Sequence, residues 1–114
     1  MEFDIGTILS VAYGKLLTED IGKVYKMLNY MFDTNLFTHQ LPKAARVASE
    51  CILDKYPQLR DWKTENEKVN TENWKEYRSL AREKFGHFLE IEKVDDSLYE
   101  PVNWFEEAVK LMRK

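Results

Sequence analysis

Apolar residues recur at intervals of three and four along most of the chain, which is the spacing of amphipathic α-helices. The first such run covers residues 5–13, with Asp4 before it and Gly14 after it. An Asp side chain accepts hydrogen bonds from first-turn amides, and glycine readily adopts the left-handed backbone at a helix end. We therefore expect a short helix here, and the alternative interpretation is a strand over ILSVAY, residues 8–13.

A second run ends at Phe32, and either Thr18 or Asp20 is a suitable N-cap for it. Lys23 and Lys26 fall opposite its apolar side, so the pattern predicts a helix that buries one face. The expected buried face consists of Ile21, Val24, Tyr25, Leu28, Met31 and Phe32.

The connection that begins at Asp33 combines turn-forming residues with apolar ones. Pro42 lacks an amide hydrogen and suits a first helical turn, which predicts a third helix over residues 40–56 that Pro57 terminates. Three alanines on its apolar face allow another helix to approach closely, so we expect this helix at the tightly packed centre of the fold. That face consists of Leu41, Ala44, Ala45, Ala48, Cys51 and Ile52.

The next stretch, residues 58–70, is strongly charged and fits either a partly exposed helix or a mobile connection. A further helix is expected to begin at Asn70 or Thr71 and to stop at Gly86. Its predicted inward side chains are Trp74, Tyr77, Ala81, Phe85 and Phe88.

Residues 87–94, HFLEIEKV, alternate apolar and polar positions as a half-buried strand does. A strand needs a partner, and we expect it in residues 8–11, if those are extended. Pro101 opens a last predicted helix, whose basic C-terminal residues complement the helix dipole. The inward residues of that helix are Trp104, Phe105, Ala108, Leu111 and Met112.

Together these elements predict a mainly α fold, a compact bundle of four to six short helices, with one small β-hairpin or two-stranded element in an α+β alternative. A chain of 114 residues suits a single globular domain, residues 1–114, that removes roughly two-thirds of its unfolded surface from water. The charged segment 58–70 is the candidate mobile part of this domain.

Charge and cysteine usage narrow the classes of function. A net charge of −3 argues against a dedicated nucleic-acid binder, because phosphate contacts usually leave a basic excess on the domain. One cysteine cannot form an internal disulfide, the N-terminus lacks the pattern of a signal peptide, and no apolar run reaches the ~18 residues of a membrane span. We therefore expect a cytoplasmic protein without membrane contact.

Few residues offer catalytic chemistry. Cys51 needs an imidazole nearby to act as a nucleophile, from His39 or His87. His39 precedes Cys51 by 12 positions, which is roughly 18 Å along one helix and excludes this pair. Cys51 also lies on an apolar face, where cysteine behaves as a small hydrophobic residue. No metal-ligand spacing and no nucleotide or hydrolase motif occurs. We predict no enzymatic activity, no cofactor and no metal site, with an unrecognised enzyme site around His39 as an alternative.

The second and third helices could be taken for a helix-turn-helix motif, in which Lys43 and Arg46 would contact the phosphates of DNA. That motif uses a turn of three or four residues, and here about seven intervene. Glu50 and Asp54 also follow on the same helix. Direct DNA binding is therefore not expected, and a small DNA-binding regulator using Lys43 and Arg46 remains an alternative.

Residues 90–107 hold seven acidic residues against Lys93 alone, a local charge of seven minus one, or −6. An acidic surface speeds encounter with a basic partner and can imitate phosphates, and interfaces favour aromatic residues beside charges. The first candidate partner-binding surface consists of Glu92, Asp95, Asp96, Tyr99, Glu100 and Trp104. The second, in the connection before the third helix, consists of Asn35, Phe37 and His39.

Several segments taken together resemble a group of small uncharacterised proteins of tailed phages and prophages, with an FTHQLP-containing domain of unknown function. The segments are MEFDIGTILSVAYGKLL, DIGKVYKMLNYM, NLFTHQLPKAA, GHFLEIEKV and YEPVNWFEEA, of which LNYM and FTHQLP are the most specific. The resemblance implies a viral origin and an early or accessory role, and carries over no catalytic residue. We therefore expect a phage accessory protein of the host cytoplasm that binds a host or phage protein or nucleoprotein complex, in the manner of an inhibitor of a bacterial defence such as CRISPR.

Overall fold

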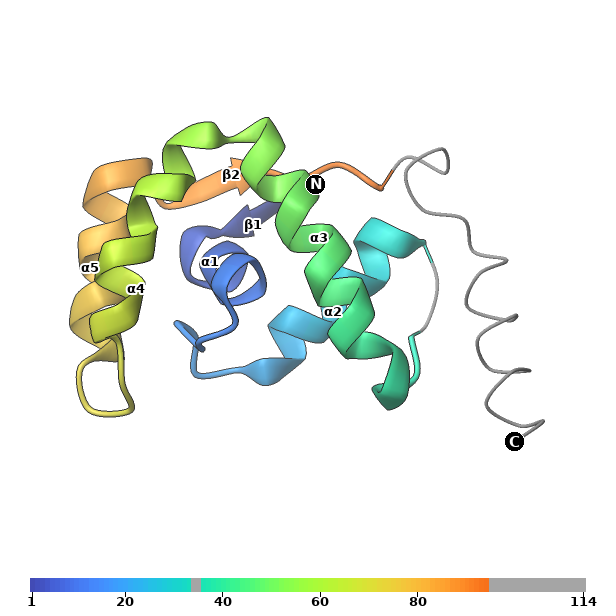
Figure 1. Cartoon of the computed structure of the whole chain (residues 1–114), viewed down its shortest axis with the longest axis horizontal. Helices are drawn as coiled ribbons and strands as arrows, with labels where there is room; N and C mark the ends of the chain where they lie inside the picture. The colour runs from blue at the N-terminus through green and yellow to red at the C-terminus, as the bar shows by residue number, and fades with distance from the viewer. Residues whose placement is uncertain (34–35, 95–114) are drawn as a thin grey trace.

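The computed structural model describes residues 1–33 and 36–94 (Figure 1). This part of the chain forms five α-helices, two 3₁₀-helices and one two-stranded antiparallel sheet, which confirms a mainly α bundle with a small two-stranded element. The elements in order are β1 Glu2–Asp4, α1 Ile5–Tyr13, α2 Ile21–Phe32, η1 Thr38–Gln40, α3 Leu41–Lys55, η2 Pro57–Trp62, α4 Lys63–Lys68, α5 Trp74–Phe85 and β2 Phe88–Glu90. The helix expected from Pro101 lies outside the described residues.

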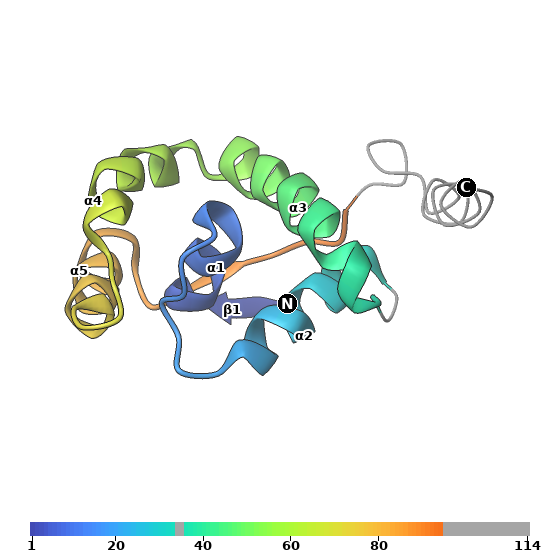
Figure 2. The same ribbon diagram turned by 60° about the horizontal axis from the view of Figure 1, so that its bottom comes forward.

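The centre of the fold is α1, in which every residue from Ile5 to Ala12 is buried. Asp4 caps it as expected, because its carboxylate accepts hydrogen bonds from the Thr7 amide at 2.9 Å and the Thr7 hydroxyl at 2.8 Å. Gly14 ends it with a left-handed φ of 82°. Figures 1 and 2 show α1 enclosed by α2, α3 and the α4–α5 pair. A helix that is apolar on all sides belongs in such an interior.

The alanine face of α3 is not the centre of the fold, contrary to the expectation from its small residues. It covers α1 instead, with Ala44 and Ala48 fully buried. The Ser49 hydroxyl donates to the Ala12 carbonyl at 2.7 Å, which shows how closely the two helices approach. α3 carries charged residues on its other side, so that side can face solvent. α1 has no charged side, and it therefore lies in the interior.

α2 also departs from its expected burial. The spacing predicts Ile21 and Tyr25 on the buried face, but these residues are 45% and 42% exposed. Met27, which the predicted face omitted, is fully buried, and all buried residues of α2 lie between Met27 and Met31. The repeat predicted one face along the whole helix, but α1 and α3 cover only its C-terminal half.

The charged segment 58–70 takes the helical alternative, as η2 and α4. Its apolar side chains anchor it to the core, since Leu59 and Trp62 are fully buried. The Trp62 ring meets the rings of Tyr77 and Phe85 edge-on, with centroids 6.2 and 6.1 Å away. This aromatic contact joins η2 to α5.

Of the strand predicted over residues 87–94, only Phe88–Glu90 forms, as β2, and its partner is β1 and not residues 8–11. Phe3 lies opposite Leu89 in this antiparallel register. Residues 8–11, the expected partner, lie inside α1. Their backbone amides and carbonyls form the hydrogen bonds of that helix and cannot pair with a strand. Asp4 has the extended backbone of an N-cap, so the residues just before α1 can continue it as a strand. This strand is too short for a pattern of alternating apolar and polar positions to be recognised in the sequence.

α5 begins at Trp74, later than the expected start at Asn70 or Thr71. The Asn70 side chain accepts hydrogen bonds from the amides of Glu72 and Asn73 at 2.8 and 2.9 Å, which closes a turn before the helix. Phe88, expected on the inward side of this helix, lies in β2 and is 59% exposed. Among the described residues, no helix has the length and apolarity required to cross a bilayer.

Candidate partner-binding surface

The structure places three of the predicted surface residues. Of the first candidate surface it describes Glu92, and of the second it describes Phe37 and His39. The remaining residues lie outside the described ranges, namely Asn35, Asp95, Asp96, Tyr99, Glu100 and Trp104.

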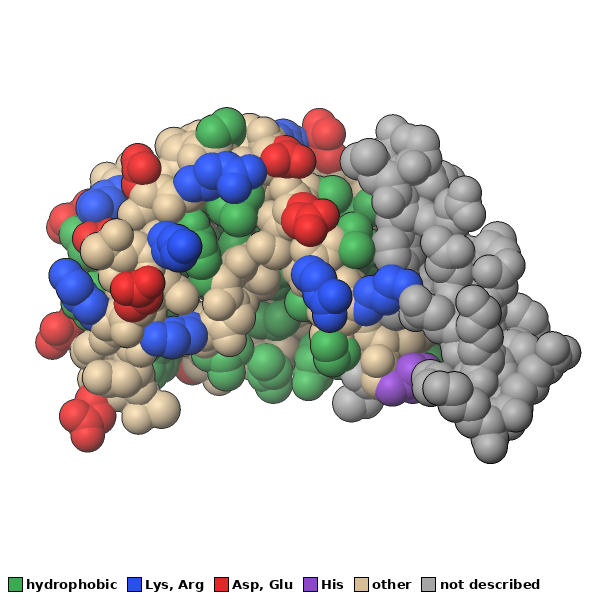
Figure 3. Space-filling view, viewed as in Figure 1, with side chains coloured by type: hydrophobic (Ala, Val, Ile, Leu, Met, Phe, Trp, Pro, Cys, Tyr) green, Lys and Arg blue, Asp and Glu red, His purple; other side chains and the backbone are tan. Residues whose placement is uncertain are grey.

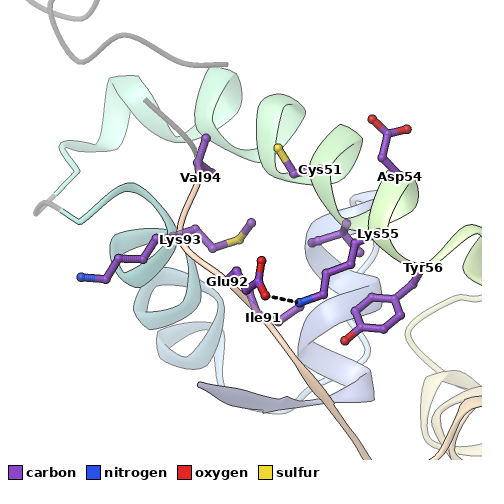
Figure 4. A pocket seen from close by; sticks show the side chains of 10 residues that line it. Cys51, Asp54, Lys55, Tyr56, Ile91, Glu92, Lys93 and Val94 are labelled. Atoms are coloured by element: carbon purple, nitrogen blue, oxygen red, sulfur yellow. Dashed lines mark ion pairs between the residues drawn. The ribbon is translucent and has the colours of Figure 1, made fainter. Parts of the chain in front are cut away.

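Glu92 lies at the edge of a pocket of about 440 Å³ between α3 and the segment after β2 (Figure 4). The Lys55 ammonium pairs with its carboxylate at 3.2 Å. The neighbouring acid Glu90 pairs with the amino group of Met1, and its carbonyl accepts a hydrogen bond from the Tyr56 hydroxyl at 2.7 Å. Both acids that the structure describes in this run therefore have a cation of the same chain beside them.

The interior of this pocket is apolar, and Cys51 points into it from α3 (Figure 4). Burial raises the pKa of the Cys51 thiol, and the carboxylates of Asp54 and Glu50 raise it further. A thiol with a raised pKa is a poor nucleophile near neutral pH, because the thiolate is the reactive form. The apolar lining consists of Met31, Ile52, Ile91 and Val94.

Within the described ranges, the two histidines do not complete a site around this thiol. Neither His39 nor His87 lines the pocket. The His87 carbonyl accepts a hydrogen bond from the Ile5 amide at 2.8 Å, at the junction between α5 and β2. No group of three His, Cys, Asp or Glu side chains suited to a metal ion occurs in residues 1–33 and 36–94.

Phe37 and His39 form a stacked pair on the surface just before α3, with ring centroids 6.0 Å apart and planes 4° from parallel. The Phe37 side chain is 69% exposed. Two hydrogen bonds hold its backbone, because the Gln40 side chain accepts from the Phe37 amide at 2.8 Å and the Asn29 side chain accepts from the Leu36 amide at 2.9 Å. The Phe37–His39 pair is therefore an exposed aromatic surface on a hydrogen-bonded backbone.

The cations of α3 follow directly after this pair. Arg46 is exposed and Lys43 is half-buried, and we call these two residues the basic end of α3. The sequence contains no acidic residue between Asp33 and Glu50. In Figure 3, histidine and Lys or Arg colours lie together over the N-terminal half of α3, and acidic colour lies further along the helix. One end of α3 is thus locally basic in a chain whose net charge is −3.

A second hollow, which the sequence did not indicate, lies between residues 15–19 and 69–74 and measures about 730 Å³. Leu16, 49% exposed, and the half-buried Trp74 line it. The Lys15 ammonium donates to three carbonyls at the end of α4, at 3.0 to 3.3 Å. Periodicity carries no signal for this hollow, because both of its sides are connections between helices.

Residues 3–62 match the model of a protein family described as a domain of unknown function, DUF7736. The match covers more than half of the chain. The chain belongs to this family. The family region runs from β1 to η2 and contains the Phe37–His39 pair and the basic end of α3, whereas the acidic residues from Glu90 onward lie outside it. The chain matches no curated protein and no solved structure.

Proposed function

We propose that this member of the family is a phage accessory protein without enzymatic activity that binds a host or viral macromolecular complex and inhibits a bacterial defence such as CRISPR. The contact surface that we favour is the Phe37–His39 pair. The observation that carries this choice is the 69% exposure of Phe37 on a hydrogen-bonded backbone. Burial of such a ring against a partner removes apolar surface from water with little ordering cost.

The acidic run of residues 90–107 is the second candidate surface. Lys55 pairs with Glu92, and the Met1 amino group pairs with Glu90, which reduces the local negative charge available to a partner. A binding surface common to the family lies within the matched residues. These residues include the pair but not the acidic run. These two observations support placing the Phe37–His39 pair first.

The test of this surface is capture of the partner complex from infected cells by tagged protein. A Phe37→Ala and His39→Ala double variant should fold normally by circular dichroism and lose most of the captured complex. Truncating an aromatic anchor at an interface costs about 2 kcal/mol or more, which lowers affinity about thirtyfold or more. Phe88→Ala is the matched control, because Phe88 is 59% exposed but lies in β2 outside the family region.

A second variant separates the two candidate surfaces. Glu92, Asp95, Asp96 and Glu100 are changed together to Lys, and folding and capture are measured in the same way. If this charge-reversed variant loses capture while the Phe37 and His39 double variant retains it fully, the acidic run is the binding surface. Undiminished capture by both folded variants would remove both surfaces from the proposal.

Inhibition of a defence system has a separate readout. A host whose CRISPR system targets a test phage is made to express the protein, and the plating efficiency of that phage is measured. We expect a rise in plating efficiency that the double variant does not give. Equal plating with and without the protein would rule out inhibition of that CRISPR system, while partner capture would still test the binding function.

A further inference from the structure

We infer that the uncovered N-terminal half of α2 binds a second copy of this chain, with the two α2 helices antiparallel around a two-fold axis. This surface is separate from the Phe37–His39 pair, and the inference does not depend on the proposed function.

Exposed apolar side chains gather at the start of α2. Of the six large apolar side chains that are exposed in the described residues, three lie between residues 16 and 25, namely Leu16, Ile21 and Tyr25. Figure 3 shows apolar colour along the lower edge of the molecule, where Figure 1 has the connection before α2 and the first turns of α2. A contiguous apolar surface in water indicates a contact with another molecule.

The apolar side of α2 continues from its covered half into its uncovered half. Leu28 is buried, whereas Ile21 and Tyr25, one turn apart on the helix surface, are 45% and 42% exposed. Gly22 lies beside them without a side chain, and the atoms nearest to a Cβ at this position belong to Asp20 of the same helix end. A second helix can therefore approach the backbone of α2 closely at this point.

The order of charges around this surface indicates a second copy as the occupant. In an antiparallel pair of helices, each step back along one helix is a step forward along the other. A pair in which Ile21 faces Tyr25 of the second copy therefore also places Asp20 opposite Lys26 of that copy. Two-fold symmetry repeats both contacts, so the surface is complementary to itself in shape and in charge.

Both charged groups can take part in this contact. Asp20 and Lys26 are exposed, and in the part of the chain that the structure describes Lys26 makes no ion pair. One Asp20 oxygen accepts from the Gly22 amide at 2.9 Å, so the other oxygen can accept from a cation of the second copy. Lys23, the other cation in this half of α2, lies 4.0 Å from the Asp4 carboxylate. It therefore points toward its own chain, and like charges do not meet at the two-fold axis.

The experiment is sedimentation equilibrium of the full chain between about 10 µM and 1 mM protein. A contact between two half-helices is smaller than a standard interface, so we expect a weak dimer with a Kd of about 100 µM. The average mass should rise with concentration from that of one chain toward that of two. The mass of one chain at every concentration would overturn the inference and leave this face to a different protein. A mass that rises beyond two chains would overturn the two-fold arrangement, because a two-fold contact closes at two copies.

Two truncations assign the contact to α2. Ile21→Ala and Tyr25→Ala should fold normally by circular dichroism, because both side chains are exposed. Symmetry places each change in the interface twice, so each variant should raise the Kd about tenfold or more. Phe88→Ala is the matched control, since Phe88 is 59% exposed on β2, and it should leave the Kd unchanged. Dimer formation that neither α2 variant weakens would contradict the inference.

Lys26→Glu tests the charge pairing. It places a carboxylate opposite Asp20 of the second copy, twice in each dimer, so the Kd at about 50 mM salt should rise about fivefold or more. About 0.5 M salt should reduce this difference, because salt screens exposed charges. Lys63→Glu changes the net charge equally at an exposed position of α4, and its Kd should stay within about twofold of the wild type. Equal Kd values for the two variants would overturn the antiparallel arrangement that the inference states.

Discussion

α1 and the Phe37–His39 pair both lie in the family region, yet they differ completely in burial. All residues from Ile5 to Ala12 are buried, whereas Phe37 is 69% exposed. In α1 the small residues Gly6 and Ser10 let the backbone of Leu17 lie close to the helix. In the pair, a large aromatic side chain is left in solvent. Substitutions in α1 should therefore act on folding, and substitutions in the pair should act on binding.

Among substitutions in α1 and in the pair, Gly6→Ala should have the largest effect on folding. A Cβ at this position would lie 2.3 Å from the Leu17 carbonyl oxygen, which belongs to the backbone and cannot turn away. We expect a loss of about 3 kcal/mol or more in the free energy of unfolding, measured by chemical denaturation. Gly22→Ala is the control, because the nearest atom there belongs to the Asp20 side chain, which can rotate. Equal losses in both variants would contradict the close approach of residue 17 to α1.

Ser10→Ala should have the next largest effect. The Ser10 hydroxyl donates to the Gly6 carbonyl at 2.7 Å and accepts from the Leu17 amide at 2.8 Å. Without it the buried Leu17 amide loses its partner, which should cost about 1–3 kcal/mol of unfolding free energy. Ser79→Ala on the exposed side of α5 should stay within about 0.5 kcal/mol of the wild type. A similar result for both serines would show that Leu17 finds another acceptor.

Glu19→Gln should change how stability depends on pH. The pKa of Glu19 is lowered by a hydrogen bond from its own backbone and by the Arg78 guanidinium, which joins the connection before α2 to α5. The folded state thus holds on to this proton less tightly than the unfolded state, so the stabilisation is present above the unfolded pKa and is lost as pH falls through the folded pKa.

Thermal melting between about pH 7 and pH 3 checks this sign. The wild type should lose more stability over this range than Glu19→Gln, and the two melting curves should converge at the acidic end. Glu83→Gln, on the exposed side of α5, should follow the wild type. Parallel pH profiles for wild type and Glu19→Gln would show that the Arg78 pair contributes nothing to stability.

Phe37→Ala should have the smallest effect on folding. The side chain is 69% exposed, so truncation removes little buried surface, and the unfolding free energy should change by less than about 0.5 kcal/mol. Trp62→Ala is the contrasting truncation, because that ring is fully buried against α5 and its loss should cost about 3–5 kcal/mol. A large loss for Phe37→Ala would contradict its exposure and leave the binding tests without a folded variant.

The sequence was informative about the candidate surfaces only at the level of residue type. The sequence shows Phe37 and His39 as an aromatic residue and a histidine in a connection, but their stacking depends on the backbone that Gln40 and Asn29 hold. The pairing of Glu92 with Lys55 joins two elements far apart in the chain, so a count of acidic residues could not show it. The hollow beside Leu16 arises where two connections meet, which no periodic pattern marks.

By itself, the sequence determined the fold class and most of the helix termini, although not the start of α5. Asp4, Asp20, Gly14, Pro57 and Gly86 act through their own backbone or through amides two or three residues away, so these signals are local. The tertiary structure alone decided that α1 is the central helix, which half of α2 is buried, that β1 pairs with β2, and that Phe37 remains in solvent. Each of these depends on contacts between residues far apart in the chain, and a helical repeat states only that a side is apolar, not which surface will cover it.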